Sequence, residues 1–451
     1  MIVLSAREAT GDLTMIDNRF AGSRADRRSE RLSASQAGTT ADPILMLVGA
    51  DPSELSARQR ASLYVLCALT GIAEGFGLQS GGMAAPKFAA EFHLLPDFVG
   101  GIFLVTSLGL ALGASVGGWA GDRIGSGRVM NMAVALFGLA SIGSARSSTG
   151  HELAVMRGLM GLGLGGALPN LIALLTYVGR PETASRRVTL SIAAVSGGAL
   201  LVGLTMLLGG AAVGWRFLFN LGGWPSLALA AVLPFLLPAV RIPRAAHAGQ
   251  AAPKGERWRA LFGRGRIATT LLLWFCFFVT AAASYLLINW APTFLLRAGL
   301  NQHQVGVGMI GLATGGAAGP ALLGSLLRPT RTRLVVCLAY LGTISGMCLM
   351  LIAPKTVLFL CLGIAYTGFF TAGTQALLFG VVGPFYPASV RGTGVGSAVA
   401  LGRIGSGAGP AVAGMMLAAG LGQDNVIAAA IPMIVLVILC LLWLLRRPQV
   451  A

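Results

Sequence analysis

Twelve long apolar stretches run through this chain, and they constrain its fold more than any other feature of the sequence. Each stretch is close to the roughly 20 residues that an α-helix needs to cross a lipid bilayer. In lipid, helices satisfy their own backbone hydrogen bonds, so the sequence predicts an all-α membrane protein with twelve transmembrane helices. The expected spans are 61–85, 98–120, 129–146, 152–178, 188–212, 217–239, 267–296, 306–327, 334–353, 357–382, 392–420 and 426–445.

Composition agrees with this class. The mean hydropathy is +0.77 and only 11% of the residues are charged, whereas roughly a quarter are charged in a soluble domain. All six cysteines fall inside the expected spans and none forms a CxxC pair, which is typical of buried apolar side chains. The four histidines show no metal-ligand spacing. We therefore expect no metal, no cofactor and no enzymatic chemistry.

The net charge of +17 is distributed very unevenly between the two sides of the expected bundle. With a cytoplasmic N-terminus, eighteen Lys and Arg residues fall in the connections on the cytoplasmic side and five on the opposite side. This bias follows the positive-inside rule and predicts that both termini are cytoplasmic. No aromatic residues are interleaved with a basic stripe, so nucleic acid is an unlikely partner.

The chain is expected to divide at its middle. A basic segment with Pro and Gly, 241–266, separates six spans from six, which predicts one half over 61–240 and another over 267–445. Two such halves suggest parallel repeats with a binding site at their interface, near the middle of the bilayer. Residues 1–60 are polar and aperiodic and are expected to form a disordered cytoplasmic tail, and 446–451 a short C-terminal tail.

Glu74 is the only acidic residue expected at bilayer depth, in the first span. A charged carboxylate in hydrocarbon costs a few kcal/mol or more, so such residues are commonly functional. We interpret Glu74 as a proton- or ion-coupling group. The alternative is a structural carboxylate paired with a buried arginine.

Two arginines also lie within spans, Arg403 in the eleventh and Arg157 in the fourth. A guanidinium can grip a carboxylate through two parallel hydrogen bonds, so either residue could bind a substrate carboxylate or balance the charge of Glu74. The alternatives are contacts with backbone carbonyls between helices or, for Arg157, a place near the periplasmic mouth.

Polar and aromatic residues in the spans of the second half are further candidates for substrate binding. Asn289 and Gln375 could hydrogen-bond a ring hydroxyl, and Tyr285 could stack on an aromatic ring. Each of them has an alternative role in hydrogen bonds between helices or in an interfacial aromatic belt.

The connection between the second and third spans, GGWAGDRIGSGR, has the form of a gating loop. It resembles the signature loop of the major facilitator superfamily at Gly118, Asp122, Arg123 and Gly125. We expect Gly118 to allow a close approach of helices and Asp122 to pair with an arginine or cap a neighbouring helix. The loop would then latch the cytoplasmic side in one state and release it in the other. The resemblance implies the major facilitator fold.

Four longer segments narrow the resemblance: GIAEGFGLQSGGMAAPKFAAEF, RGLMGLGLGGALPNLIAL, LLLWFCFFVTAAASYLLINWAP and RGTGVGSAVALGRIGSGAGP. They resemble the aromatic acid:proton symporter family and, within it, most resemble bacterial 3-hydroxyphenylpropionate transporters. That family usually has a second acid three residues after the first, where this chain has Gly77. The departure bears on the number of protons coupled and leaves more of the coupling to Glu74.

These observations together predict a proton-coupled importer of an aromatic carboxylate, such as a hydroxyphenylpropionate or hydroxybenzoate. It would be a monomer in contact with membrane lipid, located in the inner (cytoplasmic) membrane of a bacterium. Two alternatives remain open at this point. The first is an exporter of aromatic or amphipathic compounds on the same fold, and the second is a ligand sensor that does not transport.

Overall fold

The computed structural model describes residues 57–177, 184–236, 261–263, 266–327, 330–352, 354, 356–387 and 390–446. All of these belong to one compact unit, residues 49–451. The expectations for the N-terminal tail, for most of the basic linker and for the last C-terminal residues lie outside the described residues.

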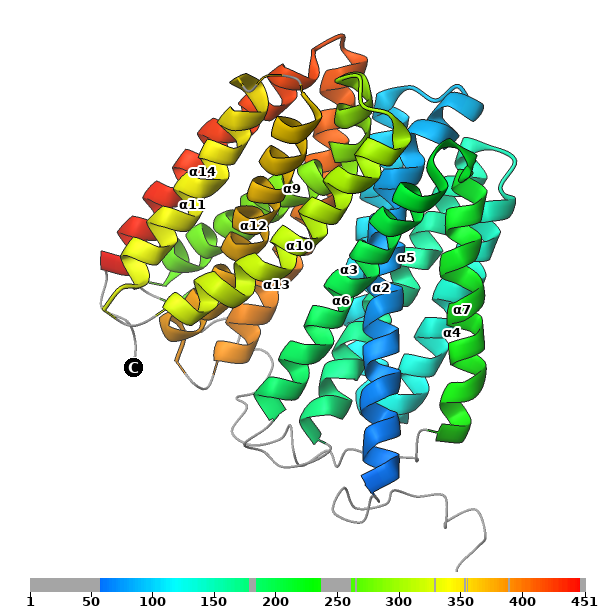
Figure 1. The fold of residues 1–451 in the computed structure, drawn as a ribbon. Helices are drawn as coiled ribbons and strands as arrows, with labels where there is room; N and C mark the ends of the chain where they lie inside the picture. The colour runs from blue at the N-terminus through cyan, green and yellow to red at the C-terminus, as the bar shows by residue number, and fades with distance from the viewer. Residues whose placement is uncertain are drawn as a thin grey trace, which may run out of the picture. The chain divides into compact units, whose positions relative to one another are not determined.

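Six long helices follow one another in the first half of the described chain, and six in the second (Figure 1). The first six are α2 (Ala57–Glu91), α3 (Pro96–Ile124), α4 (Ser126–Arg146), α5 (Gly150–Tyr177), α6 (Ala184–Gly209) and α7 (Trp215–Leu236). The others are α9 (Ile267–Arg297), α10 (Gln302–Leu326), α11 (Thr332–Ile352), α12 (Val357–Val382), α13 (Arg391–Ala418) and α14 (Gln423–Arg446). Two short 3₁₀ segments follow α6 and α12, Gly210–Ala212 and Gly383–Phe385.

The twelve helices match the twelve expected spans, which confirms the all-α membrane fold. Within the described chain, eleven of them are long and apolar enough to cross a membrane. The twelfth, α13, has 28 residues and is long enough, but its glycines and its two arginines, Arg391 and Arg403, lower its hydropathy. Large apolar side chains such as Phe235, 88% exposed, and Leu208, 75% exposed, cover the outside of the bundle, as expected where lipid is the solvent.

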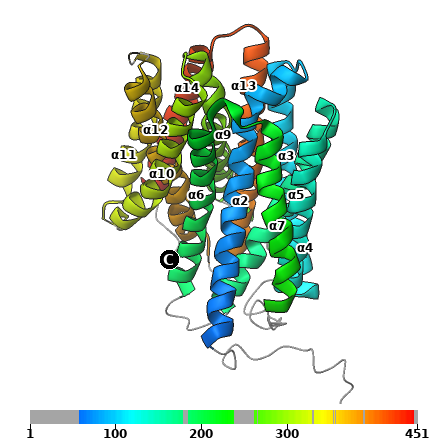
Figure 2. The ribbon, with the colours of Figure 1, turned by 45° about the vertical axis from the view of Figure 1, so that its right-hand side comes forward.

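The two halves repeat one packing scheme. In the first half α3 packs on α5, α4 on α5 and α7, and α2 on α6 and α7. Figure 2 shows α2 lying between α6 and α7. Each pair recurs in the second half, where α10 packs on α12, α11 on α12 and α14, and α9 on α13 and α14. This correspondence is the parallel repeat expected from the six-plus-six order of spans.

Contacts between the halves obey the same symmetry. Helix α3 packs on α13, its counterpart α10 packs on α6, and α2 packs on α9. Glycines make these contacts close: a Cβ on Gly306 of α10 would lie 2.6 Å from the backbone nitrogen of Leu207 on α6. On α13, a Cβ on Gly407 would lie 2.8 Å from the Cβ of Ser107 on α3. Small residues thus set the distance between the halves, as is common in membrane bundles.

All glycine contacts between the halves in the described chain lie toward one end of the bundle. This end carries the turns between α2 and α3 and between α9 and α10, and we call it the α2–α3 end. On α2 the contact is at Gly82, on α6 at Gly203 and on α13 at Gly414, in each case in the half of the helix nearer that end. The halves are therefore packed together at the α2–α3 end, and their glycines make no such contacts toward the opposite end, which we call the α3–α4 end.

Candidate functional site

A cavity of about 250 Å³ lies between the halves, near the middle of the helices. Helices α2 and α6 of the first half line it together with α9, α10 and α12 of the second. None of its lining residues is charged, and most are Gly, Ala, Val, Leu or Ile. The polar lining residues are Gln79, Ser196, Ser284, Tyr285, Thr371 and Gln375. A mostly apolar hollow with a few convergent polar groups is the usual form of a small-molecule site.

Glycines allow the helices beside this cavity to pack closely within each half. A Cβ on Gly75 of α2 would lie 1.7 Å from the carbonyl oxygen of Val195 on α6. On the other side, a Cβ on Gly315 of α10 would lie 2.2 Å from the carbonyl oxygen of Ala365 on α12. Neither position tolerates a side chain, so the helices meet backbone to backbone. Small residues in the lining, such as Gly316 and Ala372, occupy little of the cavity.

Glu74 lies on α2 next to Gly75 of the lining, but it is not itself a lining residue. Its side chain is only 3% exposed, and its Oε2 atom is buried without a hydrogen-bond partner. Arg403 on α13 lies within electrostatic range of this carboxylate. The structure describes no ion pair between the two, so the alternative of a structural salt bridge has no direct contact to support it here.

Arg403 is half-buried, and its guanidinium makes no hydrogen bond or ion pair with a described residue. Its backbone carbonyl accepts a hydrogen bond of 2.6 Å from the Ser406 hydroxyl, which is a contact within the helix. Arg403 is also not among the residues that line the cavity. The guanidinium is thus a cation without a fixed partner in the described part of the chain.

Arg157 has a different environment, inside the first half. It is 2% exposed, its Nη1 lies 3.0 Å from the sulfur of Met160, and its guanidinium lies 5.2 Å from the ring centre of Phe219. Gly81 of α2 makes room for it, because a Cβ there would lie 2.2 Å from Nη2. Arg157 does not line the cavity, so a direct role in substrate binding would require a rearrangement.

Of the other expected binding residues, the structure places two in the lining of the cavity and one outside it. Tyr285 and Gln375 line the cavity. Asn289 does not, and its amide donates a 2.9 Å hydrogen bond to the carbonyl of Tyr285 one turn earlier in α9. The backbone of Asn289 instead packs against Gly82 of α2, where the halves meet.

Four polar lining residues were missed by the sequence analysis: Gln79, Ser196, Ser284 and Thr371. Gln79 could have been identified from the sequence, because it is an amide in the same apolar span as Glu74. The serines and threonine had none, because such hydroxyls commonly bond to their own helix: Ser284 donates to the carbonyl of Thr280 at 2.8 Å.

The signature loop lies at the α3–α4 end, away from the cavity. Gly125 joins α3 to α4 with φ of 99°, in the left-handed region that favours glycine. Asp122 and Arg123 are exposed, and Arg123 lies 4.1 Å from the ring centre of Trp119. The close approach expected of Gly118 is not made in this arrangement, because a Cβ there would meet open space. Its neighbour Gly117 makes the close approach instead, to Gly166 of α5.

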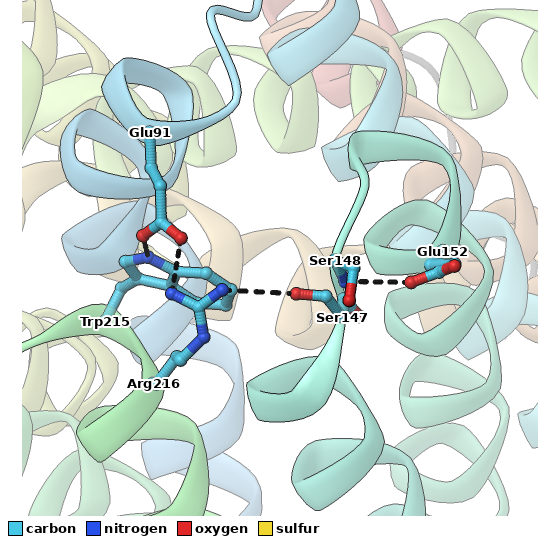
Figure 3. Close-up of polar contacts among 6 residues, drawn as sticks. All are labelled: Glu91, Ser147, Ser148, Glu152, Trp215 and Arg216. Carbon is cyan, nitrogen blue, oxygen red and sulfur yellow. Dashed lines mark hydrogen bonds and ion pairs between the residues drawn. The ribbon is translucent and has the colours of Figure 1, made fainter.

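A polar cluster joins three helices of the first half at the α2–α3 end (Figure 3). Glu91 at the end of α2 accepts hydrogen bonds from the indole of Trp215 at 2.6 Å and from Arg216 at 2.5 Å, both on α7. Arg216 also donates to the carbonyl of Ser147, just after α4, at 3.3 Å. The ion pair is more than 40% exposed on both sides, so its contribution to stability is about 0–1 kcal/mol. The cluster aligns helix ends within one half and does not cross to the other.

Sequence profiles and relatives identify the kind of protein that this chain resembles. The profile of the Major Facilitator Superfamily matches residues 67–355. The "3-(3-hydroxy-phenyl)propionate transporter" of Escherichia coli (strain K12) is 38% identical over 407 residues, which cover 88% of this chain and 96% of the relative. The "Gallate transporter" of Pseudomonas putida is 29% identical and covers 80% of this chain and 86% of the relative.

Solved structures share the fold at low sequence identity. A bacterial homologue of the human lysosomal transporter Spinster, in an inward-facing and unoccupied conformation, has a TM-score of 0.67 and 16% identity. That match covers 87% of this chain and 98% of the other. A D-xylose–proton symporter has a TM-score of 0.64 and 16% identity, with 84% and 96% covered. At this identity the likeness shows the fold alone.

Proposed function

Because the chain belongs to the major facilitator superfamily, and is a membrane transporter and not an enzyme, we propose that it imports an aromatic carboxylate together with protons. The observation that carries this proposal is the uncharged cavity between the halves, with a buried carboxylate that has an unpartnered oxygen next to its lining. No resident cofactor enters the mechanism.

The substrate class rests on the cavity and on the relatives. An apolar hollow with neutral polar groups suits an aromatic ring better than a sugar, which would need many hydrogen bonds. Relatives at 38% and 29% identity are named as transporters of a hydroxyphenylpropionate and of gallate, both aromatic carboxylates. Arg403 does not line the cavity in this arrangement, so a rearrangement would have to bring its guanidinium to the substrate carboxylate, where two parallel hydrogen bonds would hold it with the ring in the cavity.

Glu74 is the proposed proton carrier. Its Oε2 atom is buried without a hydrogen-bond partner, so the site is costly for a charged carboxylate and inexpensive for a protonated one. Protonation would remove that cost when the site closes, and loss of the proton on the other side would let Arg403 act on the carboxylate of Glu74 again. Release of substrate and proton would thus be linked through one cation.

Alternating access would use the two ends of the bundle. The halves meet at the α2–α3 end, which the bias of basic residues assigns to the periplasm. The α3–α4 end, where α2 begins and α14 ends, would face the cytoplasm of a bacterial cell. In this inward-open arrangement Asp122 makes no ion pair with a described residue, as expected for a released latch. Each chain contains both halves that line the cavity, so we propose that a monomer in the inner membrane is sufficient.

The test is uptake into liposomes that contain the purified protein and carry an inward proton gradient. The panel comprises benzoates, hydroxybenzoates, phenylpropionates and aliphatic acids, with and without an uncoupler. We expect accumulation of an aromatic acid that the uncoupler abolishes. Glu74→Gln should abolish accumulation but retain exchange of labelled for unlabelled substrate, because exchange needs no net proton movement.

Each other outcome would count against a stated part of the proposal. Accumulation by Glu74→Gln against a gradient would show that coupling lies elsewhere. Movement of the acid only into the proton-rich compartment, opposite to the flow of protons, would indicate an exporter. Binding of the acid without any flux would indicate a sensor.

A further inference from the structure

We propose that Gln79 and Gln375, one from each half, form the group that recognises a hydroxyl on the substrate ring, so that the favoured substrates are hydroxylated aromatic acids. This inference rests on the proposed function, and it assigns Gln79 as a specificity-determining residue.

Gln375 on α12 presents an acceptor without a donor. Its Oε1 atom is buried and has no hydrogen-bond partner, although the residue lines the cavity. An unpaired buried carbonyl oxygen is unfavourable, so the site is complementary to a ligand that brings a hydrogen-bond donor.

Two of the four hydroxyls in the cavity lining are already engaged in hydrogen bonds within their own helices. Thr371, one turn before Gln375 on α12, donates to the carbonyl of Thr367 at 2.8 Å. Ser284 on α9 donates to the carbonyl of Thr280 at 2.8 Å. Each has its single hydroxyl proton engaged within its own helix. None of the four hydroxyls in the lining, those of Ser196 and Tyr285 included, donates to Gln375 Oε1 in the structure, so a ligand can supply this donor.

Gln79 on α2 provides the second amide, from the opposite half. It is 7% exposed, it lines the same cavity, and no described residue hydrogen-bonds to its side chain. An amide carries both a carbonyl acceptor and an NH₂ donor. A phenolic hydroxyl donates one proton and accepts others, so it can donate to Gln375 Oε1 while it accepts from the NH₂ group of Gln79.

The chemistry of the cavity restricts which ring substituents the two amides can bind. No lining residue is charged, so the cavity is suited to the neutral end of the substrate and not to its carboxylate. A methoxy group can accept a hydrogen bond but has no proton to donate, so it would leave Gln375 Oε1 unpaired. An unsubstituted ring would leave both amides without a partner. The pair therefore distinguishes a hydroxyl from both a hydrogen and a methyl ether.

The experiment measures the dissociation constants of purified protein for phenylpropionate and for its ring-hydroxylated and ring-methoxylated forms, with each ring position tested. The parent should bind its best hydroxylated isomer about tenfold more tightly than the unsubstituted and methoxylated acids, as one desolvated hydrogen-bonding group commonly contributes. Gln79→Leu and Gln375→Leu should each lose most of that preference, so that the ratio of the dissociation constants of the unsubstituted and hydroxylated acids falls toward one.

Gln423→Leu is the matched control, since Gln423 on α14 also has a buried, unpartnered Oε1 but lies outside the cavity. It should keep the full preference. Gln375→Asn, which retains the amide but withdraws it by one methylene, serves if a leucine variant is unstable, and it should also lose the preference.

The outcomes separate this inference from the proposed function. If the parent transports aromatic acids but does not prefer hydroxylated ones, or if both leucine variants keep the preference, the amide pair is not the recognition group. If the parent binds no aromatic acid at all, the proposed function fails and this inference fails with it.

Discussion

Gly306→Ala should open the bundle at the α2–α3 end. The new Cβ would lie 2.6 Å from the backbone nitrogen of Leu207 on α6 and 3.0 Å from the carbonyl oxygen of Gly203. The first separation is about 1 Å shorter than the optimal contact of roughly 3.5 Å. Because both neighbouring atoms belong to the backbone, they cannot turn aside as a side chain would, so α6 and α10 must separate.

The expected size of the effect follows from the cost of overpacking. Extra atoms in a packed interior commonly cost about 1–3 kcal/mol. The cost applies only while the halves are in contact at this end, and it disappears in the state that is open there. Since 1.4 kcal/mol is a factor of ten, the ratio of the open to the closed state should rise by about 5- to 150-fold.

A reporter cysteine can measure this shift. Ser107 of α3 is 9% exposed and faces Gly407 of α13, across the contact between the halves. In a background without the six native cysteines, Ser107→Cys should react faster with a membrane-impermeant thiol reagent when Gly306→Ala is present. Gly324→Ala is the control on the same helix, because a Cβ there would meet open space. Equal labelling of parent, control and Gly306→Ala would refute the reasoning.

Three further changes test other parts of the site. Arg403→Lys should weaken transport although it keeps the positive charge, because an ammonium group cannot form the two parallel hydrogen bonds of a planar guanidinium. In binding assays, Arg403→Lys and Arg403→Ala should both lose the parent's preference for an aromatic acid over its uncharged amide analogue. Asp122→Asn should lower the transport rate with little change in binding, so a selective loss of affinity would contradict a role in gating. Gly77→Asp, which restores the second acid of the family pattern, should lower the melting temperature, because its Cβ would lie 2.7 Å from the buried ring of Phe137. An unchanged melting temperature of Gly77→Asp would show that the ring of Phe137 moves aside at little energetic cost.

The number of spans, their order and the fold class were determined by the sequence alone. Each depends only on local properties of the sequence, namely the length and hydropathy of a segment and the charges that flank it. These properties do not depend on which helices pack beside the segment. The isolation of Glu74 was evident for the same reason. Its burial without a partner for Oε2 agrees with that interpretation, although its role in coupling stays a prediction.

The positions of side chains relative to one another were decided only by the tertiary structure. Sequence analysis grouped Arg157 with Arg403, but Arg157 lies inside the first half against Phe219. It expected Gly118 to make the close helix contact that Gly117 makes in the structure, and it did not identify Gln79 as a residue of the cavity. A step of one residue turns a side chain by about 100° around a helix, and which face meets a neighbour depends on how the helices pack. Helix packing therefore selected the cavity residues and the end at which the halves meet.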